Sequence, residues 1–501
     1  MRKIILLMVV AALSACGKVQ MPTNCKPIDA QPNIFPDYVS VTIPCNIAPL
    51  NFMLADTVLP IVVEAKNDNG FSYVLKNCQG KVLWPAKVWE KLKNGKTISI
   101  TIAVQNADGS YSQYQPIVQH VVPDSVDSYL AYRLINTGYV LWEKMGLYQR
   151  CLENFEQSPI IESQSVNRAC INCHTFCNNN PNTMMFHTRM HNGGTNIIYN
   201  GKVQRYNTKT PISMSAGVYS SWNPNGYLLA MSTNAISQQF TSGGDDRIFV
   251  SDRASDIVLL NMKTNTLTTC PRLSTPDLEN LPAWAPDGKT LYYITRKKRD
   301  TYPMQNPQAE DLYDLCRITY NVDDNSWGSV DTVLRSSQVG ASISFPKVCP
   351  TNGRYVALTL ANRGYFAIQN KQSDIALLDV ETGELTKPQI NSNFAESNHA
   401  WSSNGHWLVV GSKRIDGVFT RPFIAYFDAN GNFGKPFVVP QEEPDFYKNF
   451  LLNFNNSDFM ICPVPKTQIE LRNSVRGKII QVEADASVNV DALSGATNIN
   501  K

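Results

Sequence analysis

Apolar and polar residues alternate along much of the chain after residue 37. The alternating stretches are residues 38–43, 61–65 and 98–104. This period of two is typical of strands with one buried face. Residues 67–70 and 106–109 read Asn-Asp-Asn-Gly and Asn-Ala-Asp-Gly, which favour hairpin turns. We therefore expect a β-sandwich-like domain over residues 37–123, after a Pro-, Asn- and Gln-rich tether over residues 17–36.

The pattern changes after residue 124. Apolar residues between 130 and 152 recur at roughly helical intervals, with an interruption at Gly138. This spacing predicts two short helices inside a helical segment over residues 124–198.

A repeat begins near residue 195. Four units run from a turn through a glycine into an apolar strand, and three of them open on Trp222, Trp284 and Trp401. Their turn glycines are Gly226, Gly288, Gly353 and Gly405. A glycine in a tight turn between strands takes a positive φ. Such repeats stack radially into a propeller, which we expect over residues 199–465.

The repeat contains recognisable sequence motifs. Trp284-Ala-Pro-Asp-Gly288 and Asp374-Ile-Ala-Leu-Leu-Asp379 resemble the motifs of TolB-type β-propellers. The resemblance implies six blades, of which four are legible, so flanking strands at 196–206 and 459–463 would supply the others. The predicted fold class is mainly β. A propeller by itself does not indicate an activity.

Composition and charge argue against some classes of binding partner and of activity. The 501 residues carry a net charge of +3 and have 43% hydrophobic content, as in a globular protein. The chain has no basic patch with interleaved aromatic residues, which argues against a nucleic-acid partner. We find no motif of a hydrolase, a P-loop or a dinucleotide site.

The strongest chemical signal is Cys170-Ile171-Asn172-Cys173-His174, which reads C-x-x-C-H. This is the attachment motif of c-type haem, in which two thiols form thioethers and the histidine binds iron. With 12 cysteines and six histidines, chance would give it roughly 0.003 times per chain. A disulfide, a thioredoxin-like C-x-x-C or half of a zinc site are the alternatives.

A six-coordinate haem needs a second axial ligand. His187 and Met190 lie shortly after the motif and are the two candidates, with His187 ranked first on ligand type. His399 and His406 flank a turn of the repeat, and we interpret both as structural.

The N-terminus reads as an export signal. Two basic residues precede an apolar run over residues 4–13, which is too short to span a bilayer. Leu13-Ser14-Ala15-Cys16 resembles the lipobox of bacterial lipoproteins, which implies a signal peptide over residues 1–16 and lipidation of Cys16. The following Gly17-Lys18 implies the outer membrane, and we favour its periplasmic face. An exported chain can form disulfides, and Cys25 with Cys45 is the predicted pair.

The C-terminal tail, residues 466–501, contains Asp491-Ala-Leu-Ser-Gly-Ala-Thr497. It resembles the tag that ApbE-type flavin transferases esterify with FMN in exported redox subunits. The resemblance implies covalent FMN on Thr497. The flavin-binding domain that accompanies the tag in that family is largely missing from this sequence.

Together these features predict a lipid-anchored envelope redox protein. One haem c would act as a fixed electron relay, with the propeller docking an unidentified redox partner. The alternative is a non-redox propeller lipoprotein that binds an envelope protein or glycan, with Cys170 and Cys173 as a disulfide.

Overall fold

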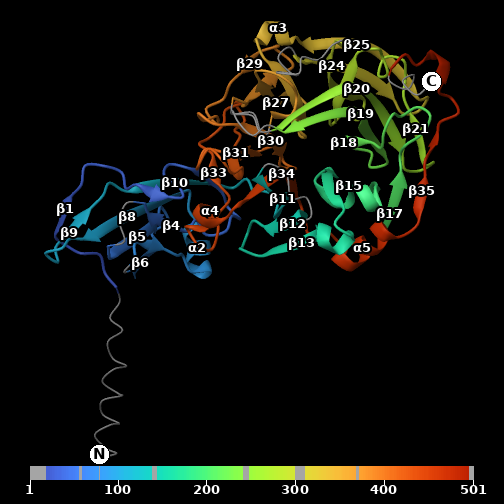
Figure 1. The fold of residues 1–501 in the computed structure, drawn as a ribbon. Coiled ribbons are helices and arrows are strands. Elements are labelled where there is room, and N and C mark those ends of the chain that lie inside the picture. Colours follow the sequence, from blue (N-terminus) through green and yellow to red (C-terminus); the bar gives the residue numbers. More distant parts are fainter. Residues whose placement is uncertain are drawn as a thin grey trace, which may run out of the picture. The chain divides into compact units, whose positions relative to one another are not determined.

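The computed structural model describes residues 19–55, 59–77, 79–137, 144–240, 248–299, 311–367 and 372–495 (Figure 1). It divides into two compact units. Unit 1 comprises Met1–Ser125 and Pro440–Asn449, and unit 2 comprises Val126–Val439 and Phe450–Lys501.

Unit 1 is built on a seven-stranded sheet. Its main path runs β1-β9-β8-β10-β3, and β5 pairs with both β8 and β6. The strands are β1 (Cys25–Pro27), β3 (Thr42–Pro44), β5 (Ile61–Asn67), β6 (Ser72–Asn77), β8 (Thr97–Gln105), β9 (Tyr111–Gln113) and β10 (Ile117–Val122). The predicted alternation is visible in the first half of β8, where Ile98, Ile100 and Ile102 are buried and Thr97, Ser99 and Thr101 are half-buried.

A second, three-stranded sheet of unit 1 has the order β2-β4-β7. Its strands are β2 (Ile34–Phe35), β4 (Phe52–Leu54) and β7 (Lys81–Val82), and the unit also holds α2 (Ala86–Leu92) and α4 (Phe446–Asn449). The segment 440–449 returns to this unit from the far end of the chain. Lys81 Nζ lies 2.9 Å from a Glu443 carboxylate oxygen, and Asn51 Nδ2 donates to the Glu442 carbonyl at 2.9 Å.

Two expectations for this region are wrong. Residues 17–36 contain β1 and β2, so the described part of the expected tether is built into the sheets. Cys25 and Cys45 do not form a disulfide, because each thiol instead donates to a backbone carbonyl, of Pro22 and Pro123. All ten cysteines among the described residues are free.

Unit 2 contains six sheets, which we number as blades 1 to 6 around the ring. Within each blade the strands are given from the innermost to the outermost. Blade 1 is β34 (Leu452–Met460), β11 (Tyr129–Asn136), β12 (Gly146–Cys151) and β13 (Gln157–Glu162). Blade 2 is β14 (Cys170–Cys177), β15 (Asn180–Arg189), β16 (Gly194–Tyr199) and β17 (Lys202–Asn207). Blade 3 is β18 (Val218–Trp222), β19 (Leu228–Phe240), β20 (Ile248–Asn261) and β21 (Thr266–Thr268).

The remaining blades have the same four-strand order. Blade 4 is β22 (Leu278–Trp284), β23 (Thr290–Arg296), β24 (Asp314–Asn321) and β25 (Ser326–Leu334). Blade 5 is β26 (Ser342–Val348), β27 (Tyr355–Ala361), β28 (Asp374–Asp379) and β29 (Leu385–Thr386). Blade 6 is β30 (Glu396–Trp401), β31 (Trp407–Ser412), β32 (Arg421–Tyr426) and β33 (Phe437–Val438).

The inner strands close a ring. Each contacts the next in the order β34, β14, β18, β22, β26, β30 and back to β34. Blade 1 seals the ring, because β34 from the end of the chain pairs with β11. Unit 2 is therefore a six-bladed β-propeller, the architecture that the repeat predicted. The four turn glycines have φ between +66° and +78°, which confirms their expected conformation.

The boundary of the propeller and the expected helices are wrong. Blades 1 and 2 occupy much of residues 124–198, which hold β11 to β15 together with the 3₁₀ turns η3 (Ser163–Val166) and η4 (Met190–Asn192). Leu130, Tyr132 and Leu134 are spaced by two, which is the strand period, and they lie in β11. The propeller thus begins near Val126 rather than at residue 199.

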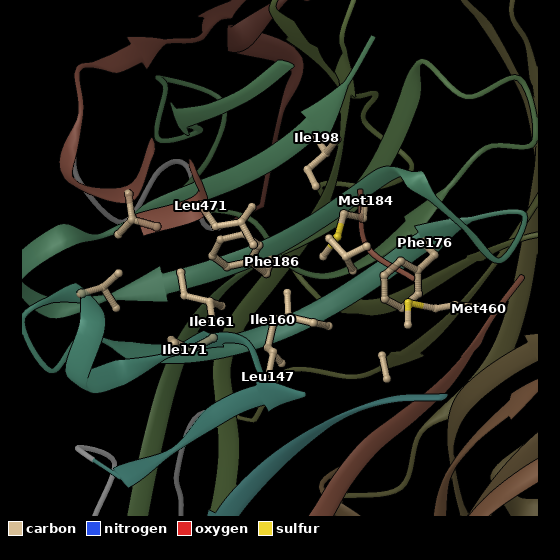
Figure 2. Close-up of a cluster of buried hydrophobic side chains, with 14 of the residues drawn as sticks. Leu147, Ile160, Ile161, Ile171, Phe176, Met184, Phe186, Ile198, Met460 and Leu471 are labelled. Atoms are coloured by element: carbon tan, nitrogen blue, oxygen red, sulfur yellow. The ribbon is translucent and has the colours of Figure 1, made fainter. Parts of the chain in front are cut away.

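The C-terminal tail runs along blades 2 and 3. Its elements are α5 (Gln468–Arg476), β35 (Ile479–Gln481), β36 (Glu483–Ala484) and η6 (Val490–Ala492). Outside the tail, the short helix α3 (Ser336–Val339) connects blades 4 and 5. Strand β35 adds to β17, and β36 adds to β21, both in parallel. Leu471 of α5 packs into the apolar cluster of blades 1 and 2 (Figure 2).

Candidate functional site in the propeller channel

The C-x-x-C-H motif lies on β14, the inner strand of blade 2. Strand β14 pairs with β15 so that Cys170 is opposite Arg189 and Asn172 is opposite His187. The register then shifts, and His174 is opposite Phe186. Cys173 is the extra residue, with φ of +39°. The motif therefore contains a β-bulge, a feature that redirects the side chains around it.

The same bulge recurs in all six inner strands. The residues in the left-handed conformation are Cys173, Tyr219, Leu281, Phe345, Asn398 and Asn456, with φ between +39° and +51°. Each coincides with a register shift between its inner strand and the neighbouring strand. The repeating bulge turns one pair of residues per blade toward the channel, and Cys173-His174 is the pair of blade 2.

Apolar side chains fix the position of the motif strand. Ile171 and Phe176 of β14 pack with Met184 and Phe186 of β15 in one buried cluster (Figure 2). Fully burying side chains of this size stabilises the fold by about 1.5–3 kcal/mol each. Arg133 of blade 1 donates to the Asn172 side chain, which ties the motif to the adjacent blade.

Cys170 and Cys173 line a cavity of about 470 Å³. This volume lies within the range of small-molecule sites. The other lining residues are Arg133, Met145, Asn172, Arg189, Met190, Tyr219, Ile236, Gln238, Val250, Phe345, Phe366, Asn398, Asn455 and Asn456. The wall is thus largely apolar and aromatic, with two guanidinium groups on the side of the motif.

His174 lines a second, smaller cavity of about 80 Å³. The two cavities share five lining residues, which are Cys173, Tyr219, Phe345, Asn398 and Asn456. They therefore adjoin along the channel, with the bulges between them.

The His174 imidazole is buried without partners. Neither ring nitrogen has a hydrogen-bond partner among the residues that the structure describes. Burial, with smaller contributions from the positive charges of Arg133 and Lys347, lowers the pKa of His174 to about 3. At neutral pH the ring is uncharged, which is the form that binds metal ions.

Both cysteines of the motif are free thiols. Burial raises the pKa of Cys170, and the nearby charges of Arg133 and Arg189 act in the opposite direction. The disulfide of the alternative hypothesis is not formed here.

The two candidates for a second iron ligand lie in different places. His187 is buried, and its Nδ1 lies 3.5 Å from Thr195 Oγ1. It lines neither cavity. Met190 is 57% exposed, has a φ of +71° and lines the 470 Å³ cavity together with both cysteines. Met190, and not the first-ranked His187, therefore shares a cavity with the two motif cysteines.

Cys16 and Thr497 lie outside the described residues. The preceding part of the C-terminal tag packs on blade 3, where Leu493 is buried and the Ser494 amide donates to the Ser274 carbonyl at 3.2 Å. Over the residues that the structure describes, no group of three or more His, Cys, Asp or Glu side chains could hold a metal ion. No helix in the same part of the chain has the length and apolarity needed to cross a membrane.

Three channel residues were not assigned to the site from the sequence, because two of them were missed and His399 was interpreted as structural. Ser220, His399 and Ser457 line the 80 Å³ cavity beside His174. A signal was present, because Ser220 and His399 each lie two residues before the tryptophan of a repeat, as His174 lies two before Phe176. Aligning the blades on these aromatic residues would have placed them at one level of the channel.

Comparisons with known proteins add the following. No family model matches the chain. No curated protein matches it either. Among solved structures, TolB from Acinetobacter baumannii is 12% identical over 75% of this chain and 85% of its own, with a TM-score of 0.43. An oligogalacturonate lyase in complex with manganese is also 12% identical, over 61% of this chain and 72% of its own, with a TM-score of 0.33. The six-bladed assignment rests on the strand order and the closed ring.

Proposed function

We propose that this chain is a one-electron redox protein that carries a single haem c in the propeller channel. The supporting observation is the juxtaposition of two free thiols with a buried, uncharged imidazole that has no hydrogen-bond partner. Cys170 and Cys173 would form the thioethers, and His174 would bind the iron. Bound haem would supply the Fe³⁺/Fe²⁺ couple.

The surroundings of the motif suit such a group. The 470 Å³ cavity beside both thiols is lined mainly by apolar and aromatic side chains. Met190 would be the second protein ligand of the iron in this proposal, because it shares that cavity with the thiols. A methionine ligand raises the reduction potential relative to a second histidine. A haem held in the wall of a propeller would be a fixed relay, and the propeller would dock the redox partner.

The location and the flavin are further parts of the proposal. Cys16 would anchor the chain by its lipid to the periplasmic face of the outer membrane. Attachment of haem c is also completed outside the cytoplasm, so the anchor and the haem require the same export. Thr497 would carry FMN and so link two-electron to one-electron transfer. Intact mass after co-expression with a flavin transferase tests this, and a Thr497→Ala variant is the control. An unchanged mass would remove the flavin from the proposal.

Haem attachment is tested by producing the exported protein in a host competent for c-type maturation. We expect a reduced α-band in the pyridine haemochrome spectrum and one haem mass on the intact chain. The variant Cys170→Ala/Cys173→Ala should lose both signals. Cys177→Ala is the matched control, because Cys177 is a free thiol on the same strand outside the motif. A wild-type protein without haem would refute the proposal.

The same mass measurement tests the alternative. A ligand-binding propeller with a Cys170–Cys173 disulfide would weigh two hydrogens less than the reduced chain. The cavity volume alone is compatible with this reading.

A further inference from the structure

The second residue of each bulge forms a ring at one level of the channel. In the order of the blades these residues are Ser457, His174, Ser220, Pro282, Pro346 and His399. All six line the 80 Å³ cavity. Because β30 and β34 are neighbours, the four polar residues form one continuous arc and the two prolines face it.

Polar atoms on this arc lack partners. Besides the two nitrogens of His174, the buried atoms without a hydrogen-bond partner in the described part of the chain are His399 Nε2, Ser457 Oγ and Ser220 Oγ. The other nitrogen of His399 lies 3.3 Å from Thr359 Oγ1, which holds that ring in place. Buried polar groups are nearly always hydrogen-bonded, to protein or to ordered water. If one nitrogen of His174 binds iron, four such atoms remain on one small cavity, and they point to something that bonds them all.

Water suits this cavity better than an ion does. A volume of about 80 Å³ matches two to three water molecules, each with a share of about 30 Å³. Lys347 also lines the cavity, and its positive charge acts on both His174 and His399, which disfavours a free metal cation inside this cavity. Asp458 lines it too, which disfavours an anion. Hydroxyl groups and neutral imidazoles can each donate or accept a hydrogen bond, as a water cluster requires.

We propose that ordered water in this cavity joins His174 to His399, Ser457 and Ser220, which act as positioning residues for the iron-binding histidine. This rests on the proposed haem function. Histidines that bind metals use their other ring nitrogen for a hydrogen bond, which fixes the ring and makes the ligand more basic. No protein atom of the described residues does this for His174, so the water cluster takes that place.

The test is an equilibrium redox titration of the haem-bearing protein, followed through its α-band. His399→Phe removes one polar group and fills part of the cavity, and Ser457→Ala removes another with little change in shape. A less basic His174 stabilises Fe³⁺ less, so both variants should raise the reduction potential. We expect a threefold to tenfold change in the reduction equilibrium constant, where tenfold corresponds to about 59 mV for one electron. His399→Gln retains a hydrogen-bonding group and should restore most of the wild-type value.

The matched control is His406→Phe. His406 belongs to the same blade, but it bonds the Phe427 carbonyl and lies outside the cavity, so its loss should leave the potential unchanged. An unchanged potential in both His399→Phe and Ser457→Ala, with haem attached, would overturn this role and leave the haem proposal intact. A wild-type chain that binds no haem would overturn both. A crystal structure with water bridging His174 to the arc would support the role, and a dry cavity would contradict it.

Discussion

The inner strands of blades 2 and 4 contain the same kind of bulge, but the two bulges present different side chains to the channel. In blade 4 the bulge carries Leu281 and Pro282, which are apolar. In blade 2 it carries Cys173, a free thiol, and His174, whose ring nitrogens have no hydrogen-bond partner among the described residues. The backbone at the two bulges is nearly alike, with φ of +51° and +39°.

The difference indicates where the chemistry of this propeller comes from. The repeat supplies a rigid ring in which every blade presents one pair of residues to the channel. Substituting that pair in a single blade introduces reactive groups without a new fold. Blade 4 therefore shows what the scaffold alone requires, and blade 2 shows what has been added to it.

The largest expected effect breaks the packing that holds the motif strand. Phe186 is fully buried opposite His174, so Phe186→Ala should lower the free energy of unfolding by about 3–5 kcal/mol. Denaturant unfolding of the haem-free protein measures this. Phe186→Leu is the control and should cost less than about 1.5 kcal/mol. Equal losses in the two variants would mean that the cluster does not fix β14.

The next prediction concerns the pH dependence of stability, which has opposite signs for a buried carboxyl group of blade 4 and a buried histidine of blade 2. Burial raises the pKa of Glu279, at the start of β22, to about 8, so the folded state binds the proton more tightly than the unfolded state. Its contribution to stability is therefore present at low pH and is lost as the pH rises from 4.5 toward 8. In blade 2, burial lowers the pKa of His187 to about 3, and stability is lost instead as the pH falls from 6.5 toward 3.

Glu279→Gln keeps a polar group beside Thr275 and removes the charge. The variant should gain on the order of 3 kcal/mol relative to wild type between pH 5 and pH 8. Unfolding curves at both pH values measure the gain. Glu381→Gln, which changes a carboxyl group that is mostly exposed, should show no such gain. A constant difference between Glu279→Gln and wild type would show that Glu279 is already charged at pH 5.

Much of this architecture was predictable because its signals are local. The turn glycines and alternating strands of blades 3 to 6 follow from short-range chemistry, and the expected conformations were confirmed. Blade 1 was not legible, because β34 and β11 are more than 300 residues apart along the chain and meet only when the ring closes. Blade 2 lacks the turn glycine of blades 3 to 6 and the tryptophan of blades 3, 4 and 6, and it uses Asn178 and Asn179 at positive φ instead.

The features of the site also divide into local ones, which could be predicted from the sequence, and long-range ones, which could not. The motif residues are contiguous, so their chemistry could be predicted from the sequence. The cavity, the position of Met190 and the polar arc with His399 depend on ring closure and on six aligned bulges. His187 was ranked above Met190 on ligand type, and pairing with β14 and β16 then buried it within blade 2.

A smaller effect concerns the tail, which covers blade 2 and has no counterpart in the described four strands of blade 4. Thr467 caps α5, with its Oγ1 accepting from the Glu470 amide and the Glu470 side chain accepting from the Thr467 amide. Thr467→Ala should cost about 1 kcal/mol. Hydrogen exchange of the α5 amides measures it, and Thr467→Ser should retain the protection. Unchanged exchange in Thr467→Ala would mean that tail packing alone holds α5.

The smallest effect tests why blade 2 tolerates strain. Met190 has a φ of +71°, whereas the chain after blade 4 uses Gly340 at +69°. A residue with a side chain in this conformation costs about 1 kcal/mol, which glycine avoids. Met190→Gly should therefore raise the free energy of unfolding of the haem-free protein by up to about 1 kcal/mol, and Gly340→Ala should lower it by a similar amount. If Met190 is the second iron ligand, the same Met190→Gly substitution should lower the reduction potential of the haem-bearing protein, whereas Gly340→Ala should not. A gain in stability with an unchanged potential would mean that Met190 is strained for some other reason than iron binding.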